Sequence, residues 1–321
     1  MSSDKRTNKL VAMQGRLDIK LIIVQGPTAS GKSELAVHLA ERFSGEIVNA
    51  DSMQVYRSMD IGTAKPSVAQ RQRIPHHLLD IVDPDQTFSA ADFCREAEKV
   101  LVDIARRGKK IIVCGGTGLY IRALTKGLMD SPASDAALRA ELIDLASREG
   151  NAPLYRRLTE VDPVSAERIH PNDQVRIVRA LEVYQLTGRP ISELRGEHRF
   201  GTLRYDYCKI GLSIDRASLY EKINSRVDSM IEKGFIEEVK NLLAKGYPPS
   251  LKPMRSIGYR QVCDYLEGAI TLDEAIQVMK RDTRRYAKRQ LTWFNQDVEI
   301  KWIEYPENVA IIEHIAHDYF D

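Results

Sequence analysis

A glycine-rich segment near the N-terminus has residue types and spacing suited to binding phosphate. It runs Gly26-Pro27-Thr28-Ala29-Ser30-Gly31-Lys32-Ser33 and matches the pattern G-x-x-x-x-G-K-[ST]. In such a loop the backbone N–H groups converge on phosphate oxygens, and the lysine adds a mobile positive charge. The hydroxyl of Ser33 is suited to ligate Mg²⁺. We therefore predict that this loop holds a phosphate compound, without specifying which one.

Asp51 is the second candidate for chemistry. The short apolar segment Glu46–Ala50 predicts a strand that brings Asp51 to its C-terminal end. In open α/β sheets, ligands bind at that edge. Asp51 is thus placed near a bound ligand, and Asp51 and Asp80 are candidates for an acid near a metal ion.

A third segment combines glycines with a hydroxyl. The buried strand predicted at Lys110–Cys114 runs into Gly115-Gly116-Thr117-Gly118, where an ordinary nucleotide kinase would place an acidic residue. Glycines let a backbone approach a ligand closely, and Thr117 can donate a hydrogen bond to a ligand oxygen. A tight turn in which Thr117 only caps the next helix is the alternative.

A basic helix near the C-terminus is the fourth candidate. The helix predicted at Leu272–Phe294 carries basic residues at spacings that align most of them on one stripe, and Asp282 is the single acid between positions 280 and 289. These basic residues are Lys280, Arg281, Arg284, Arg285, Lys288 and Arg289. Such a stripe suits a nucleic-acid backbone, and a solvated helix face is an equally good interpretation of the charges alone.

The elements that must hold these residues alternate between strands and helices. The apolar run Leu21–Val24 predicts a buried strand before the phosphate loop, and Leu35 to Phe43 has helical spacing after it. Further strands are predicted at Leu78–Val82, at Tyr205–Ile214 and, as an edge strand, at Ile300–Ile303. This alternation predicts an α/β fold with a parallel sheet flanked by helices.

Strand patterns are missing between about Met129 and Thr202, where helical periods predict an all-helical insertion. The predicted division is a flexible extension at 1–20, a core domain at 21–128 and 203–321, and a helical insertion domain at 129–202.

Composition limits the class of protein. The 321 residues carry a net charge of +2, so a nucleic-acid partner would have to bind a local basic patch. The four cysteines are far apart and have no zinc spacing, and the adjacent pair His76-His77 is expected to be structural. The sequence has no signal peptide and no apolar segment long enough to cross a bilayer, so we expect a cytoplasmic protein without membrane contact.

Taken in order, the motifs resemble those of the tRNA dimethylallyltransferase family, also called tRNA isopentenyltransferases. The resemblance covers about residues 20 to 303 and includes the phosphate loop. The other matching motifs are Asp51-Ser52-Met53-Gln54-Val55-Tyr56, Gly62-Thr63-Ala64-Lys65-Pro66, Pro75-His76-His77-Leu78-Leu79-Asp80, Gly115-Gly116-Thr117-Gly118-Leu119-Tyr120, Asn172-Asp173, Arg179-Ala180-Leu181-Glu182-Val183, Ile257-Gly258-Tyr259-Arg260-Gln261 and Lys288-Arg289-Gln290-Leu291-Thr292-Trp293.

The resemblance implies a P-loop NTPase-like fold and a specific reaction. A dimethylallyl group would pass from dimethylallyl diphosphate to the exocyclic N6 amine of the adenosine 3′-adjacent to the anticodon in tRNA, with Mg²⁺ present and diphosphate released. By similarity, Asp51 is the general base, Lys32, Thr117 and Arg226 stabilise the leaving group, and Ser33 reaches the metal. The chain ends without the zinc finger of eukaryotic relatives, which implies a bacterial-type enzyme, and we expect a monomer.

The resemblance also implies a tRNA surface that closes around the anticodon stem-loop. The residues predicted to contact tRNA are Asp51, Ser52, Met53 and Gln54, then Gln174, Val175, Arg176, Ile177 and Val178 in the insertion, and Arg281, Arg284, Arg285 and Lys288 on the basic helix.

Two other functions compete with this one. A small-molecule kinase would bind ATP in the loop and use Asp51 to activate an acceptor hydroxyl. A binding protein would grip RNA without chemistry. The basic helix and the insertion count against the kinase, and a carboxylate beside the loop favours catalysis over simple binding.

Overall fold

The computed structural model describes residues 19–129, 132, 134–198 and 205–321. The chain divides into two compact units, one formed by Met1–Thr125 and Tyr205–Asp321 and the other by Lys126–Arg204. Of the predicted extension at 1–20, residues 1–18 lie outside the described part, and Lys20 already begins the first strand.

The larger unit is built on one sheet of parallel strands in the order β3-β2-β4-β1-β5-β6. The strands are β1 Lys20–Gln25, β2 Gly45–Asn49, β3 His76–His77, β4 Lys110–Gly115, β5 Asp206–Ser213 and β6 Ile300–Glu304. The helices of this unit are α2 Lys32–Arg42, α3 Val68–Arg73, α4 Ala90–Arg106, α5 Gly118–Lys126, α11 Arg216–Glu232, α12 Phe235–Ala244, α13 Tyr259–Leu266, α14 Leu272–Phe294 and α15 Val309–Phe320. The α/β prediction is confirmed, including the edge position of the last strand.

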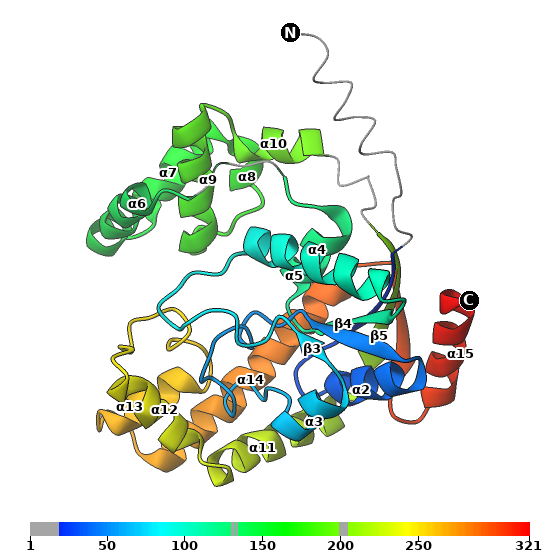
Figure 1. The fold of residues 1–321 in the computed structure, drawn as a ribbon. Helices are drawn as coiled ribbons and strands as arrows, with labels where there is room; N and C mark the ends of the chain where they lie inside the picture. Colours follow the sequence, from blue (N-terminus) through cyan, green and yellow to red (C-terminus); the bar gives the residue numbers. More distant parts are fainter. Residues whose placement is uncertain (1–18, 130–131, 133, 199–204) are drawn as a thin grey trace, which may run out of the picture. The chain divides into compact units, whose positions relative to one another are not determined.

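Helices cover both faces of this sheet (Figure 1). Alternate residues of β1 point to opposite faces, and Ile22 and Val24 pack with Leu35 and Leu39 of α2. The same cluster includes Ile312 of α15. Helix α4 contacts β2 and β4 and lies on the other side from α2. Burial on both faces explains why the central strands are continuous apolar runs.

The predicted strand at Leu78–Val82 is wrong. Strand β3 comprises only His76 and His77, and the chain then bends. Leu78 and Asp80 have φ angles of 62° and 55°, in the left-handed region, which a strand cannot accommodate. Val82 keeps a single bridge, to Tyr56. The apolar pattern here reflects the packing of a loop rather than a strand.

Helix boundaries follow their capping residues. Helices α4 and α14 begin after Ser89 and Thr271, each in a capping box. Helix α11 begins at Arg216, because the Asp215 carboxylate accepts hydrogen bonds from the N–H groups of Ala217 and Ser218.

All the regular secondary structure among the described residues of the smaller unit is helical. Its helices are α6 Ala136–Glu149, α7 Ala152–Val161, α8 Pro163–Ala166, α9 Gln174–Thr187 and α10 Ile191–His198. They enclose a core of their own that includes Leu142, Leu158 and Leu181. Glu182 is completely buried in this unit and is held by Arg139 and Arg179.

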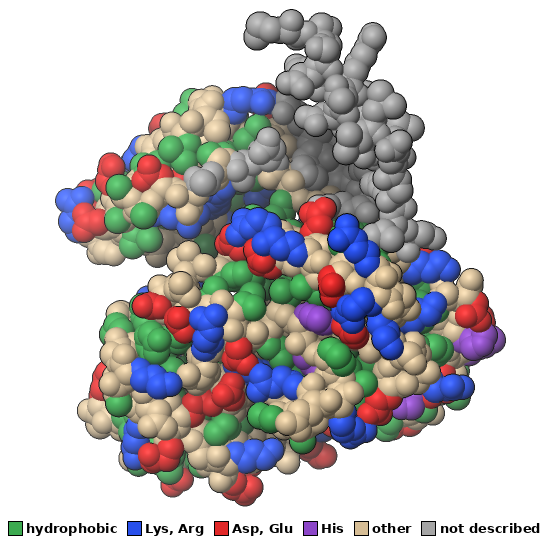
Figure 2. Space-filling view, viewed as in Figure 1, with side chains coloured by type: hydrophobic (Ala, Val, Ile, Leu, Met, Phe, Trp, Pro, Cys, Tyr) green, Lys and Arg blue, Asp and Glu red, His purple; other side chains and the backbone are tan. Residues whose placement is uncertain are grey.

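Charge is distributed rather than concentrated on the face of the larger unit that Figure 2 displays. Basic and acidic side chains are interspersed there, in keeping with the net charge of +2.

The cysteines, Cys94, Cys114, Cys208 and Cys263, are buried thiols. Among the described residues, no helix is both long enough and apolar enough to span a membrane.

Candidate active site

Three neighbouring strands end at one edge of the sheet and bring the predicted chemistry together. The phosphate loop follows β1, Asp51 follows β2 and Thr117 follows β4, and these strands are adjacent in the order β2-β4-β1. A Cβ at Gly115 would lie 2.2 Å from the carbonyl oxygen of Ala50. The close approach of the ends of β2 and β4 therefore requires glycine at this position.

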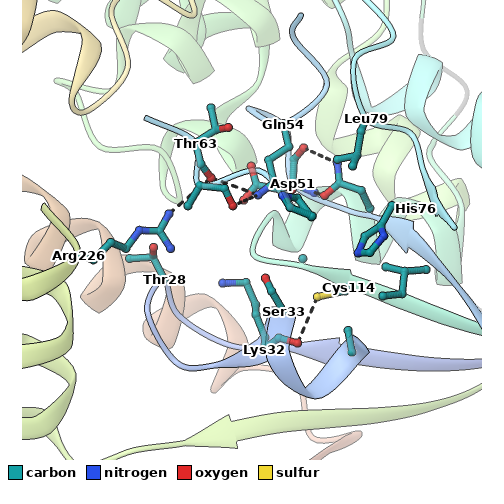
Figure 3. A pocket seen from close by; sticks show the side chains of 16 residues that line it. Thr28, Lys32, Ser33, Asp51, Gln54, Thr63, His76, Leu79, Cys114 and Arg226 are labelled. Carbon is teal, nitrogen blue, oxygen red and sulfur yellow. Dashed lines mark hydrogen bonds between the residues drawn. The ribbon is translucent and has the colours of Figure 1, made fainter. Parts of the chain in front are cut away.

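A pocket opens at this edge (Figure 3). Its polar lining includes Thr28, Lys32 and Ser33 from the loop and α2, Asp51 after β2, and Arg226 from α11. In Figure 3 the cationic ends of Lys32 and Arg226 point toward the same space, with Asp51 across from them. The remaining lining residues are Ala36, Ile47, Asn49, Gln54, Thr63, Ala64, Pro66, His76, Leu79, Cys114 and Gly115.

The two cations of the pocket are poised to meet an anion. Burial lowers the pKa of the Lys32 ammonium below its ordinary 10.5, opposed by the charge of Asp51. Burial also lowers the pKa of Arg226, and Asp51 again opposes the shift. Lys32 Nζ donates to the carbonyl of Pro27 at 3.2 Å, and Arg226 donates to the carbonyl of Thr63 at 3.5 Å. A bound polyanion would offset the unfavourable desolvation free energy of these two buried positive charges.

Asp51 is held by its own backbone segment. Its Oδ1 accepts the N–H of Met53 at 2.9 Å, and its N–H donates to the side-chain oxygen of Asn49 at 3.1 Å. Asp51 is half-buried and lines the pocket. This position suits a carboxylate that accepts a proton from a bound substrate.

Thr117 is tied to the Asp51 segment. Its hydroxyl accepts the N–H of Ser52 at 2.9 Å and lies 3.2 Å from the Ser52 hydroxyl. Thr117 is not among the residues that line the pocket, although its neighbour Gly115 is. In this structure, therefore, Thr117 fixes the backbone next to Asp51.

The loop at 60–65 forms one wall of the pocket and is clamped from α12. The Glu238 carboxylate accepts the N–H groups of Asp60, Ile61 and Gly62 at 2.9, 2.6 and 3.1 Å. It also accepts the hydroxyl of Tyr259 at 2.7 Å. Glu238 is not predictable from the sequence, because a lone glutamate on a helix carries no local pattern that marks such a clamp.

Asp80 does not remain available for a metal. Its carboxylate pairs with the buried Lys65 at 2.6 Å and with Arg71 at 2.7 Å. His77 pairs with Glu46 at 2.7 Å, and His76 Nδ1 lies 2.7 Å from the carbonyl of Ile74. In the described part of the chain, no cluster of three or more His, Cys, Asp or Glu side chains is arranged to hold a metal ion.

A family model with the description IPP transferase matches residues 54–297. A tRNA dimethylallyltransferase from Geotalea uraniireducens is 63% identical over 308 residues, which cover 96% of this chain and 99% of that protein. This chain belongs to the IPP transferase family. Another tRNA dimethylallyltransferase, from Geobacter sulfurreducens, is 59% identical over 94% of this chain and 97% of its own length. The resemblance seen in the motifs is thus confirmed, and these relatives indicate a bacterial member.

Two solved structures of IPP transferases are also similar to this one. A full-length tRNA isopentenylpyrophosphate transferase from Bacillus halodurans has a TM-score of 0.70 and 39% identity, covering 94% of this chain and 97% of that one. A eukaryotic dimethylallyltransferase, solved acting on tRNA, has a TM-score of 0.79 and 32% identity and covers 92% of this chain and 77% of its own. The P-loop NTPase-like fold is therefore confirmed.

The basic residues of α14 fall into two groups in this IPP transferase. Arg281, Arg285, Lys288 and Arg289 are exposed. Lys280 pairs with Asp228 of α11 at 2.6 Å, and Arg284 donates to Asn224 of α11 at 2.7 Å. Both of these side chains are half-buried. Packing between the two helices thus engages the charges at these two positions.

The predicted tRNA residues of the smaller unit lie at the start of α9. Val175 is 81% exposed and Arg176 is exposed, with Gln174 half-buried beside them. Ile177 and Val178 are buried in the core of that unit. The side chains of these two residues therefore cannot meet RNA, because they already pack against other helices of their own unit.

Proposed function

We propose that this IPP transferase moves a dimethylallyl group from dimethylallyl diphosphate to the exocyclic N6 amine of the adenosine 3′-adjacent to the anticodon in tRNA. The observation that carries the proposal is the pocket that unites Lys32, Arg226 and Asp51. Two cations that suit a diphosphate and one carboxylate that suits a proton line this pocket at the C-terminal edge of the sheet, which supports the proposal for a chain of this family.

The diphosphate is the leaving group. The loop N–H groups, Lys32 and Arg226 would bind its oxygens, and their positive charge stabilises the negative charge that develops when the bond between C1 and oxygen breaks. The allylic fragment delocalises the positive charge left on carbon, so little further assistance is needed at that atom. ATP is not consumed in this reaction.

Asp51 acts on the nucleophile. The N6 nitrogen of adenine forms a bond to C1 of the dimethylallyl group, and the proton that it loses goes to the Asp51 carboxylate. The adenine must leave the stack of the anticodon loop to reach the pocket. Asp51 to Gln54 would lie beside the base, and Gln174, Val175 and Arg176 would contact the anticodon stem-loop.

Mg²⁺ fits the donors that are present. Ser33 lines the pocket with an exposed hydroxyl at the start of α2, beside Lys32. Mg²⁺ in phosphate sites commonly takes one or two protein ligands and completes its shell with phosphate oxygens and water. We propose that Ser33 holds the ion together with the diphosphate, where the ion supplies further positive charge for the leaving group.

The same proposal covers the setting of the reaction. We propose that the enzyme works as a monomer. Because tRNA is the acceptor, we propose that the reaction takes place in the cytoplasm.

The test is incubation of the protein and Mg²⁺ with unmodified tRNA and either labelled dimethylallyl diphosphate or labelled ATP. We expect label in tRNA and free diphosphate with the first donor, and neither transfer nor phosphate release with ATP. Nuclease digestion should then give N6-isopentenyladenosine. Phosphate release from ATP without prenylated tRNA would favour the kinase, and tRNA binding without either reaction would favour a simple RNA-binding protein.

A further inference from the structure

Gln290 is a buried residue of α14 that bridges two segments of the site. Its Oε1 accepts the N–H of Thr28 in the phosphate loop at 2.8 Å. Its Nε2 donates to the carbonyl of Gly116 in the glycine-rich turn at 2.9 Å. Only 7% of Gln290 is exposed, so neither bond is readily replaced by water. One amide thus holds together the ends of β1 and β4.

The lack of a side chain at Gly116 leaves room for the Gln290 amide. A Cβ on Gly116 would lie 2.5 Å from Gln290 Nε2, and a Cβ on Gly118 would lie 2.2 Å from Trp293 Nε1. The glycine-rich turn is therefore fitted against α14, at residues one helical turn apart. Glycines that the sequence suggested for ligand approach are needed here for contact with a helix.

The bridge reaches the third segment of the site through Thr117. Thr117 follows Gly116, and its hydroxyl accepts the N–H of Ser52, the residue after Asp51. Within the phosphate loop, the N–H of Thr28 is committed to Gln290 and the N–H of Ser30 donates to the carbonyl of Pro27 at 3.3 Å. The N–H groups at the start of α2 have no acceptor within the helix, which suits them to a phosphate.

We propose that Gln290 is a positioning residue that sets the phosphate loop against the glycine-rich turn and so fixes the geometry of diphosphate binding. The inference rests on the proposed transferase function for its kinetic consequence, but the effect on diphosphate binding does not. Gln290 touches neither donor nor tRNA in this assignment. It acts through the backbone of Thr28 and Gly116.

A purely structural role, in which Gln290 only attaches α14 to the rest of the unit, is the alternative. Gln261 provides a matched control for it. Gln261 is also a buried glutamine, 1% exposed, whose Oε1 accepts a backbone N–H, that of Gly258, at 2.8 Å. Its Nε2 donates to Asp282 at 3.1 Å, and it does not line the pocket. Replacing Gln261 should cost stability without changing the phosphate loop.

The experiment compares Gln290→Met, Gly116→Ala, both together, and Gln261→Met with the parent. Titration calorimetry with inorganic diphosphate and Mg²⁺ measures binding, transfer assays measure KM and kcat, and thermal melts measure stability. Gln290→Met removes both hydrogen bonds of the bridge, and we expect diphosphate affinity to fall roughly tenfold or more, a loss about as large as the contribution of one buried hydrogen bond. The KM for dimethylallyl diphosphate should rise, while the KM for tRNA should change little.

Gly116→Ala tests the same bridge from its other end. The new methyl group must displace the Gln290 amide, so diphosphate affinity should fall without any change in α14 itself. The double variant should bind about as weakly as the worse single variant, because both break one bridge. If Gln290→Met does not fold, the diphosphate affinity of Gly116→Ala alone tests the proposal.

Diphosphate affinity within about twofold of the parent in both Gln290→Met and Gly116→Ala would overturn the inference. So would equal losses of affinity in Gln290→Met and Gln261→Met, which would reduce Gln290 to a structural role. The fate of the proposed function is separate. If the parent transfers no prenyl group, the function fails, whereas the affinity comparison still decides the role of Gln290.

Discussion

At the residue scale, Asp51 combines a structural and a chemical task. One oxygen caps the N–H of Met53, and the carboxylate is the group assigned to accept the proton from N6. Asparagine separates the two tasks, since its side-chain oxygen can still accept the Met53 N–H but cannot take up a proton at neutral pH. Alanine removes both.

We expect Asp51→Asn to keep the parent's thermal midpoint and tRNA affinity and to slow the chemical step about 10²- to 10⁴-fold, as loss of a positioned base does. Asp51→Ala should be equally slow and also less stable, because the Met53 N–H loses its acceptor. Single-turnover transfer with saturating donor measures the step. A chemical step at the parent rate in Asp51→Asn would remove the general-base assignment.

Lys32 gives a prediction about pH. Its pKa is lowered chiefly by burial, so the free enzyme loses this proton at a lower pH than an ordinary lysine would. Diphosphate favours the charged form. Binding should therefore be tight below the lowered pKa, weaken as the pH rises through it, and take up protons from solution in that range.

Calorimetry in two buffers with different heats of ionisation measures this proton uptake. Lys32→Arg is the control, because arginine keeps the charge and does not titrate there. Proton uptake that is the same in the parent and in Lys32→Arg would assign it to another group, such as the diphosphate itself.

At the element scale, α14 has two basic sets with different neighbours. The exposed set, which includes Arg285 and Lys288, faces solvent, whereas Lys280 and Arg284 are engaged with α11. Arg281 and Arg285 share the acid Asp282, at 3.1 and 3.6 Å, but both arginine side chains remain at least half exposed, so their charge is available to RNA.

For the variant Arg285→Ala/Lys288→Ala we expect weaker tRNA binding and a lower slope of log K against log salt, by about 0.7 to 0.9 for each phosphate that the protein no longer neutralises. The Michaelis constant for tRNA should rise more than kcat falls. The control Lys280→Ala should lower the thermal midpoint, since it breaks an ion pair with α11, and keep the parent's salt slope. If the double variant keeps the parent's salt slope, α14 is not the surface that binds the tRNA backbone.

At the scale of the whole molecule, the two units have separate cores, and the smaller one depends on a buried charge. Glu182 is fully buried, and its carboxylate accepts from Arg139 at 2.8 and 3.0 Å and pairs with Arg179 at 2.5 Å. Burial alone would raise the pKa of Glu182, but the hydrogen bonds and charges of these arginines outweigh it, so the pKa is lowered. A lowered folded pKa means that the stabilisation is present at neutral pH and is lost as the pH falls through that value.

We expect Glu182→Gln to destabilise the smaller unit by about 3 to 5 kcal/mol, as removal of one member of a buried ion pair does. Both tryptophans, Trp293 and Trp302, belong to the larger unit. In thermal melts of Glu182→Gln, far-ultraviolet circular dichroism should therefore show a transition at a lower temperature than in the parent, from unfolding of the smaller unit. Tryptophan fluorescence should not show this transition. Diphosphate affinity should stay at the parent value, and a joint shift of both signals would show that the units unfold together.

The sequence by itself determined the parts of this protein that depend on local pattern. Apolar runs and helical periods predicted the phosphate loop between β1 and α2, the strand before Asp51 and the bounds of α14. An ordered set of motifs identified the family. These features depend on residues close together in the chain, so their spacing is visible without a fold. The strand predicted at Leu78–Val82 failed because apolar composition does not reveal the left-handed angles at Leu78 and Asp80.

Only the tertiary structure decided which distant residues work together. Gln290 meets Thr28 across 262 positions, and Glu238 meets Gly62 across 176. No local period encodes such pairs. Tertiary packing also divided residues of one type that the sequence could not separate: Arg284 is engaged with α11 and Arg285 is exposed, whereas Ile177 is buried and Val175 is exposed. The physical reason is that a side chain's role depends on what packs against it, and the sheet and helix contacts that supply those neighbours form only when the chain folds.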